Sequence, residues 1–249
     1  MLAEERFSRI LSIIEAEGSA TIQELMTALD ASESTVRRDL ITMDENGLLT
    51  KVHGGAIARR ASVSTHDEDV RNRKTMNAEQ KNAIAKYAAS LIRPDDFVYL
   101  DAGTSTEAMI PFIKETQAVF VTNAISHAKL LAEKGCRVYL LGGEFKSQTE
   151  AIVGEEAMEM LSKYNFTKGF WGTNGISVSK GYSTPEIKEA MVKKYSMKNC
   201  KRCYILADAS KFDQLSSVKF ADFDQATILT TELYKPALKK YKNIVEVKE

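Results

Sequence analysis

Five stretches of the chain place hydroxyl, amide or charged side chains directly after a short apolar run. They are residues 101–106, 122–123, 142–143, 172–175 and 208–212, and the runs before them end at Leu100, Val121, Leu141, Trp171 and Ala207. Such short apolar runs, bounded by turn residues, predict buried strands, and their alternation with helical segments predicts a mostly parallel sheet covered on both faces. Ligands bind such sheets at the carboxyl ends of the strands, so we expect the five loops to meet at one edge.

The side chains of these loops suit a polyhydroxylated phosphate ester better than an apolar ligand. Residues 101–106 combine a strand end, a Gly/Thr/Ser loop and a helix start, which supply backbone amides and hydroxyls to a phosphate-sized anion. The candidate effector-binding residues are Asp101, Gly103, Thr104, Ser105, Thr106, Asn123, Gly143, Lys146, Thr173, Asn174, Asp208 and Lys211. Turn chemistry alone explains any single loop, and only the convergence of five favours a ligand site.

A second group of candidates lies at the start of a predicted helix near the N-terminus. Hydroxyls at a helix N-terminus contact DNA phosphates, and an arginine takes both acceptors of a guanine in the major groove. A hairpin after this helix carries a lysine and a histidine placed to touch the DNA backbone or the minor groove. The candidate DNA-binding residues are Ser32, Ser34, Thr35, Arg37, Arg38, Lys51 and His53.

Three predicted helices and a hairpin position these residues. The inward faces are Phe7, Ile10, Leu11 and Ile14 for the first helix, Leu25, Met26 and Leu29 for the second, and Val36, Leu40 and Met43 for the third. Gly18 ends the first helix, Thr21 and Glu24 form a capping box for the second, and Ser32 caps the third. Residues 48–52 and 56–57 alternate as strands around a turn at Gly54 and Gly55. The pattern predicts a winged helix-turn-helix.

The alternative for this region is a structural three-helix module with a solvated charged face. Residues 1–60 carry seven basic and ten acidic side chains, a net formal charge of −3, which is poor for general polyanion binding. The acidic side chains lie largely on the first helices, however. The basic ones cluster on the third helix and the hairpin, as Arg37, Arg38, Lys51, Arg59 and Arg60. This clustering favours DNA binding.

Composition bounds the class of protein. The 249 residues are 44% hydrophobic and 27% charged, with 34 basic and 34 acidic side chains, so any nucleic-acid binding must come from a local patch. No apolar run approaches the ~18 residues of a membrane span, and no secretory segment comes after the charged first residues. Three cysteines do not form a disulfide framework. We expect a cytoplasmic protein without membrane contact, and fibrous, secreted and disordered classes are excluded.

The polar stretch 58–77 predicts a linker, because its scattered apolar residues have neither helical nor strand spacing and cannot reach a core. It separates a winged helix-turn-helix domain at 1–57 from an α/β domain at 78–249.

These residues resemble a known family, the DeoR-type bacterial transcriptional repressors. Residues 32–40 (Ser-Glu-Ser-Thr-Val-Arg-Arg-Asp-Leu) with 52–56 (Val-His-Gly-Gly-Ala) are similar to its N-terminal signature, and residues 101–106, 121–123, 141–143 and 207–212 are similar to its sensor domain. The resemblance covers nearly the whole chain. Within the family, residues 99–103 and the stretch from 172–175 through 184–185 resemble the fructose-operon repressors of low-GC Gram-positive bacteria.

The resemblance implies a sensor domain similar to ribose-5-phosphate isomerase and the CoA transferases. It implies phosphate contacts at residues 104–106, sugar or phosphate contacts at Asn123, Asp208 and Lys211, and operator contacts at Thr35, Arg37 and Arg38. It also implies a repressor of a sugar-utilisation operon that a sugar phosphate such as fructose 1-phosphate releases from double-stranded operator DNA. Spacing and composition do not distinguish one sugar phosphate from another. Paired DNA half-sites imply a homo-oligomer, a dimer or a tetramer.

Two other classes remain as alternatives. A sugar-phosphate isomerase with an appended DNA module needs a carboxylate beside the substrate carbons, and residues 172–175 contain none, although Asp101 and Asp208 could supply one. A metal site would rest on Cys200 and Cys203, but one such pair gives two ligands where structural zinc takes four. We therefore predict no catalytic residue, no cofactor and no metal.

Overall fold

The computed structural model describes residues 2–58, 63–64, 70–231, 233 and 236–247. The chain forms two compact units, one of residues 1–61 with 232–242 and the other of residues 62–231 with 243–249. Each unit has its own apolar core.

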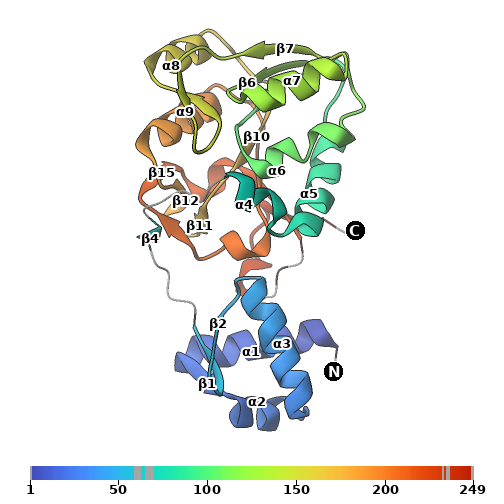
Figure 1. Cartoon of the computed structure of the whole chain (residues 1–249), viewed down its shortest axis with the longest axis vertical. Helices are drawn as coiled ribbons and strands as arrows, with labels where there is room; N and C mark the ends of the chain where they lie inside the picture. Colours follow the sequence, from blue (N-terminus) through green and yellow to red (C-terminus); the bar gives the residue numbers. More distant parts are fainter. Residues whose placement is uncertain (1, 59–62, 65–69, 232, 234–235, 248–249) are drawn as a thin grey trace. The chain divides into compact units, whose positions relative to one another are not determined.

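The N-terminal unit is a winged helix-turn-helix (Figure 1). Its elements are α1 (Ala3–Glu17), β1 (Ser19–Thr21), α2 (Ile22–Leu29), α3 (Glu33–Glu45), β2 (Thr50–Val52), β3 (Gly55–Ile57) and, later in the chain, the 3-10 helix η4 (Pro236–Leu238). The predicted inward faces of the three helices are confirmed, since all of those side chains except the half-buried Met26 are buried. The Thr21–Glu24 capping box is present, and Gly18 ends α1 in the left-handed conformation.

The wing of this unit has one more strand than the sequence predicts. Strand β1 pairs with β3, which also pairs with β2, all antiparallel. The turn lies at His53 and Gly54, and Gly55 belongs to β3. A Cβ at Gly55 would stand 2.2 Å from the carbonyl oxygen of Ala20, so glycine is needed there for strand contact rather than for the predicted turn.

The C-terminal unit is built on a seven-stranded parallel sheet in the order β17-β16-β13-β10-β5-β6-β7. The strands are β5 (Phe97–Leu100), β6 (Val119–Thr122), β7 (Arg137–Leu140), β10 (Lys168–Gly172), β13 (Cys203–Leu206), β16 (Thr227–Thr230) and β17 (Ile244–Glu246). The first five confirm the predicted parallel sheet, and the last two were not predicted.

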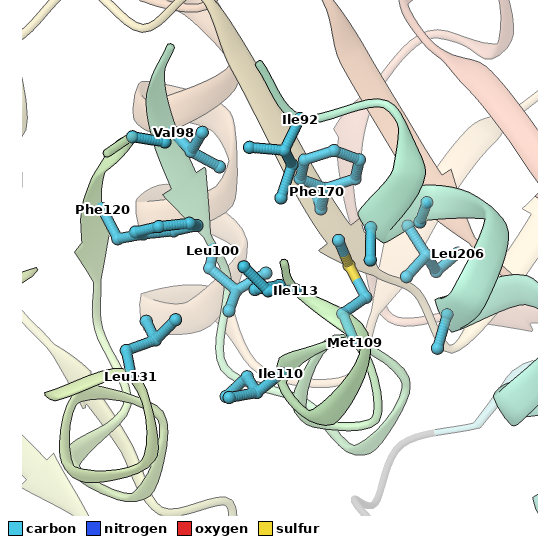
Figure 2. Packing of buried hydrophobic residues seen from close by; sticks show 14 of the residues in the cluster. Ile92, Val98, Leu100, Met109, Ile110, Ile113, Phe120, Leu131, Phe170 and Leu206 are labelled. Carbon is cyan, nitrogen blue, oxygen red and sulfur yellow. The ribbon is translucent and has the colours of Figure 1, made fainter. Parts of the chain in front are cut away.

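Helices cover both faces of this sheet, as the fully apolar strands require. They are α5 (Ala78–Ser90), α6 (Thr104–Glu107), α7 (Ile125–Glu133), α8 (Glu155–Ser162) and α9 (Ile187–Lys198). Figure 1 shows α5, α6 and α7 on one side of β10 and α9 on the other. In Figure 2, Val98, Leu100 and Phe170 point from the strands into the core that also contains Ile110 and Leu131.

Smaller elements complete the unit. They are β4 (Val63–Ser64), α4 (Val70–Thr75), η1 (Ile110–Phe112), β8 (Glu144–Lys146), β9 (Ala151–Val153), β11 (Gly175–Ser177), β12 (Gly181–Thr184), η2 (Ala209–Lys211), β14 (Leu215–Ser216), β15 (Val218–Ala221) and η3 (Phe223–Gln225). The prediction that residues 58–77 cannot reach a core is wrong at Val70, which is only 6% exposed and begins α4. One buried side chain is enough to anchor a single helical turn. No described helix has the length and apolar composition of a membrane span.

Candidate functional site

The first turn of α3 presents the candidate DNA-binding side chains to solvent. Ser32 caps the helix by accepting a hydrogen bond from the Thr35 amide at 3.4 Å, and its hydroxyl lies 2.9 Å from that of Thr35. Ser34, Arg37 and Arg38 are exposed, and Thr35 is half-buried. Arg37 carries an exposed ion pair with Glu33 at 2.6 Å, which DNA phosphates can replace because such pairs are weak.

A buried ion pair fixes the orientation of α3. Asp39 is 5% exposed, and its two carboxylate oxygens accept hydrogen bonds from Arg6 Nε at 2.6 Å and Nη2 at 3.0 Å. This two-point contact between α1 and α3 sets which residues of α3 face outward. This contact was not predicted from the sequence, although an acidic residue beside the inward-facing Leu40 was a usable signal.

The wing supplies the remaining candidates of this region. Lys51 and His53 are exposed, and the Lys51 amide donates to Asp44 Oδ1 at 3.2 Å, which ties the wing to the end of α3. Arg59 and Arg60, which were expected to add positive charge, lie outside the described residues.

The second candidate region is the edge of the parallel sheet where β5, β6, β7, β10 and β13 end, here called the strand-end edge. The five loops that carry the candidate effector-binding residues all come directly after these strands. Asn123 joins two of them, because its Oδ1 accepts from the Ala102 amide at 2.8 Å and its Nδ2 donates to the Ile152 carbonyl at 3.2 Å.

Under the strand-end edge lies a buried network of charges. Lys193 of α9 pairs with Asp101 Oδ2 and donates to the Gly172 carbonyl at 3.3 Å, so it bridges the ends of β5 and β10. Glu189, one helical turn earlier, accepts from Lys146 Nζ at 3.0 Å and from the Thr149 hydroxyl. Two acidic and two basic side chains are thus paired, and of the four only Lys146 is more than slightly exposed.

Burial and pairing set the protonation of these carboxyls. Burial raises the pKa of Asp101 to about 6, and the Lys193 ammonium opposes part of that rise. Burial also acts to raise the pKa of Glu189, but Lys193, Thr149 and Lys146 outweigh it and hold that pKa below its ordinary value. Glu189 and Lys193 were not predicted as site residues. Their signal was a charged pair at i, i+4 on a helix whose neighbouring residues, Ala190 and Val192, are apolar.

Several candidate side chains hold the loops together. The Thr106 hydroxyl is fully buried and donates to the carbonyls of Asp101 and Gly103, and Thr173 Oγ1 donates to Gly175 O at 2.9 Å. Thr184 donates to Asn174 Oδ1 at 3.1 Å. Asp208 accepts from the Ser210 amide at 3.0 Å and caps η2. All four candidate residues were expected to contact the ligand. The structure shows instead that these side-chain groups form hydrogen bonds within the protein.

Other candidates keep free groups at the strand-end edge. Thr104 and Ser105 are half-buried, and in the part of the chain that the structure describes neither hydroxyl has a hydrogen-bond partner. Lys211 is also half-buried, and no described carboxylate pairs with it. Gly103 precedes Thr104 in an extended conformation. Gly143 has a φ of +140°, and a Cβ there would lie 2.5 Å from the Val153 carbonyl oxygen, so glycine allows β9 to pass close to the chain that enters β8.

No group of three potential metal ligands comes together among the described residues. Cys200 and Cys203 are half-buried beside the start of β13, and Cys136 is buried. Trp171 lies in the core, where its indole N–H donates to the Ser196 hydroxyl of α9 at 2.9 Å.

Solved structures offer distant matches. A ribose 5-phosphate isomerase A from Methanocaldococcus jannaschii aligns at 15% identity with a TM-score of 0.42, covering 55% of each chain. A probable sor operon regulator from Shigella flexneri aligns at 12% identity with a TM-score of 0.42, covering 76% of this chain and 93% of that one.

Sequence comparisons are closer. Residues 6–61 match the DeoR-like helix-turn-helix domain, and residues 76–233 match the DeoR C terminal sensor domain. The chain is 41% identical over 249 residues to the "Uncharacterized HTH-type transcriptional regulator FruR" of Bacillus subtilis (strain 168), covering 100% of this chain and 98% of that protein. It is 34% identical over 233 residues to the "Lactose phosphotransferase system repressor" of Staphylococcus aureus (strain NCTC 8325 / PS 47), with 92% and 91% covered. These relatives are transcriptional regulators and not enzymes, and this chain belongs with them to the DeoR family of DNA-binding transcriptional repressors.

Proposed function

We propose that this protein represses a sugar-utilisation operon, a fructose phosphotransferase operon in particular, and that a sugar phosphate such as fructose 1-phosphate releases it from its operator. Residues 1–57 bind the DNA, and residues 78–249 bind the effector at the strand-end edge. The protein then acts in the cytoplasm, where operator DNA and phosphorylated sugars are both present.

One observation carries the effector proposal: the free groups at the strand-end edge are those that a phosphate ester needs. Two hydroxyls, of Thr104 and Ser105, and the Lys211 ammonium have no partner in the described part of the chain, so they are available to phosphate oxygens. Among the described residues, the other charges under the edge pair with one another. A phosphate at this edge can therefore bind two hydroxyl donors and an ammonium group, and the buried charges nearby are already paired.

The sugar part of the ligand is supported by one acceptor in the loop that carries Lys211. The carboxylate of Asp208 keeps Oδ2 outside the bonds to Ser210. One relative is a lactose phosphotransferase system repressor, so that protein regulates a system that phosphorylates its sugar. Fructose 1-phosphate is the first effector to test.

The energetics of release are modest. A hundredfold loss of operator affinity requires about 2.7 kcal/mol of difference in effector binding between two states of the protein. Two charge-assisted hydrogen bonds made in only one state supply that amount. A homo-oligomer, a dimer or a tetramer, presents two wings to half-sites about one or more helical turns apart.

The test is a gel-shift with full-length protein and the promoter upstream of its own gene. The probes are fructose 1-phosphate, fructose 6-phosphate and ribose 5-phosphate, with fructose and inorganic phosphate as controls. We expect one of the sugar phosphates to release the DNA and the two controls to leave it bound. Release by none of the three, or by fructose and its phosphates alike, would contradict the proposed effector class.

A further inference from the structure

The segment after the DNA-binding unit contains two described elements, β4 and α4, and each attaches beside a different loop of the strand-end edge. Both elements belong to the C-terminal unit. The arrangement of this segment bears on how a ligand at the edge is sensed.

Strand β4 attaches beside the loop that carries Lys211. It pairs in parallel with β14, which begins four residues after Lys211. The amide of Ser216 in β14 donates to the Ser183 hydroxyl at 2.9 Å. The Ser183 carbonyl in turn accepts from the Asn174 amide at 3.1 Å and from the Thr173 hydroxyl at 3.1 Å. The partner of β4 is therefore linked, through Ser183, to the candidate effector loop at residues 172–175.

Helix α4 attaches beside the loop that carries Thr104 and Ser105. Lys74 Nζ lies 2.9 Å from Glu107 Oε1, and Glu107 ends the helix α6 that those two residues begin. The other oxygen of Glu107 accepts from the Ser126 hydroxyl at 3.3 Å and lies 3.8 Å from His127 Nε2 of α7. Glu107 is thus held on the α6–α7 side, and Lys74 is the group through which α4 reaches it.

Both attachments are of a kind that is easily lost. Strand β4 is two residues long and the Lys74 side chain is 43% exposed, so neither contact is strongly stabilised. Val70 and the bond from Lys81 to the Arg73 carbonyl keep α4 on the unit when the ion pair breaks. A small displacement of α6 is then enough to shift α4 without unfolding it.

We propose that this segment couples the effector site to the DNA-binding unit, and that the Lys74–Glu107 ion pair is a coupling contact. A ligand that draws in Thr104 and Ser105 moves α6 and with it Glu107, and a ligand on Lys211 moves β14. Both movements change the contacts that β4 and α4, in the segment leading to the DNA-binding unit, make with the C-terminal unit. The proposal rests on the proposed function, because it assigns the regulation of the same site.

The test uses full-length Lys74→Glu, which places two carboxylates together where the ion pair was. Fructose 1-phosphate binding is measured by calorimetry without DNA, and operator affinity is measured with and without that ligand. We expect the variant to bind the ligand with an affinity within threefold of wild type. The factor by which the ligand weakens operator binding should be at least fivefold smaller than in wild type. The exchange variant Lys74→Glu/Glu107→Lys should restore the ratio. Lys163→Glu, which disrupts the exposed Lys163–Glu159 pair on α8, is the matched control and should change neither quantity.

A second readout separates coupling from mere support of the fold. In wild type, the ligand should increase amide hydrogen exchange at residues 70–75, and in Lys74→Glu exchange there should already be high without ligand. Normal release by Lys74→Glu, or loss of ligand binding in it, would overturn the coupling role. Failure of wild type to bind any of the three sugar phosphates is a different result, which would overturn the proposed function and this inference with it.

Discussion

The two functional regions of this repressor use their polar side chains in opposite ways. On α3, Arg37 and Arg38 are exposed and rest on an apolar core that does not depend on them. At the strand-end edge, Asp101 and Lys193 are buried and complete the fold that presents the free groups. The DNA-binding face can therefore be changed without unfolding its unit, whereas a change at the proposed effector site also changes the stability of its unit.

Removal of Lys193 should give the largest effect and would test this contrast directly. Lys193→Ala leaves the Asp101 carboxyl buried without its cation, and we expect the unit to lose about 3–5 kcal/mol of unfolding free energy. Urea unfolding followed by Trp171 fluorescence measures it, since that tryptophan is the one in the chain and lies in this unit. Lys163→Ala is the control and should stay within about 0.5 kcal/mol. A loss below about 1 kcal/mol for Lys193→Ala would remove the contrast between the two regions.

His127 gives a pH test of the same buried unit. Burial lowers its pKa to about 4 from an ordinary 6.5, so between these values the unfolded chain binds a proton that the folded chain does not. Stability from this group is therefore lost as the pH falls from about 6.5 through 4, by about 3 kcal/mol in total. Asp101, with its raised pKa, changes stability in the opposite direction over much of this range.

The His127 contribution is isolated by comparing wild type with His127→Gln at each pH. The unfolding free energy of wild type, relative to that of His127→Gln, should increase as the pH rises from about 4 to 6.5. Above pH 6.5 the difference should stay constant. A difference that does not vary with pH would show that His127 titrates alike in the folded and unfolded chain.

Lys211 should separate sensing from DNA binding. Lys211→Ala removes one charge-assisted hydrogen bond to the effector, so we expect effector affinity to fall by about 1.5–3 kcal/mol while operator affinity without effector is unchanged. Gel-shift titrations of the variant with fructose 1-phosphate measure both quantities. If fructose 1-phosphate releases Lys211→Ala from the operator as it does wild type, the effector does not contact the η2 loop.

Arg37 should show the smallest effect, confined to DNA. Arg37→Ala is expected to weaken operator binding by about 1–3 kcal/mol and to relax base preference if it contacts a guanine, with no change in stability. Arg9→Ala, an exposed arginine on α1, is the matched control. An equal loss on operator and unrelated DNA would identify Arg37 as a phosphate contact.

Local periodicity was enough to predict much of the fold. The inward faces of α1 and α3 and the five strand ends are set by spacing alone, since each is a contiguous pattern of apolar residues and turn signals. Strands β16 and β17 escaped prediction because helical or turn signals around them are weak, and β1 because three residues show no period.

The long-range contacts could not be predicted. Asp101 and Lys193 are 92 residues apart, and neither residue type announces its partner. The side chains of Thr106 and Asn123 also suit a ligand by residue type, but Thr106 bonds to carbonyls of its own loop, and Asn123 bonds to the backbone of Ala102 and Ile152. Which hydroxyls stay free depends on packing that spacing does not contain.

The strand order also determines the sequence of events during synthesis. The central strand β5 pairs on one side with β6, made soon after it, and on the other with β10, about seventy residues further along the chain. Lys193 is made later still. A nascent chain on the ribosome therefore presents its three helices and wing while β5 still lacks a neighbour, and a premature stop before α9 leaves Asp101 without Lys193 and β10 without β13.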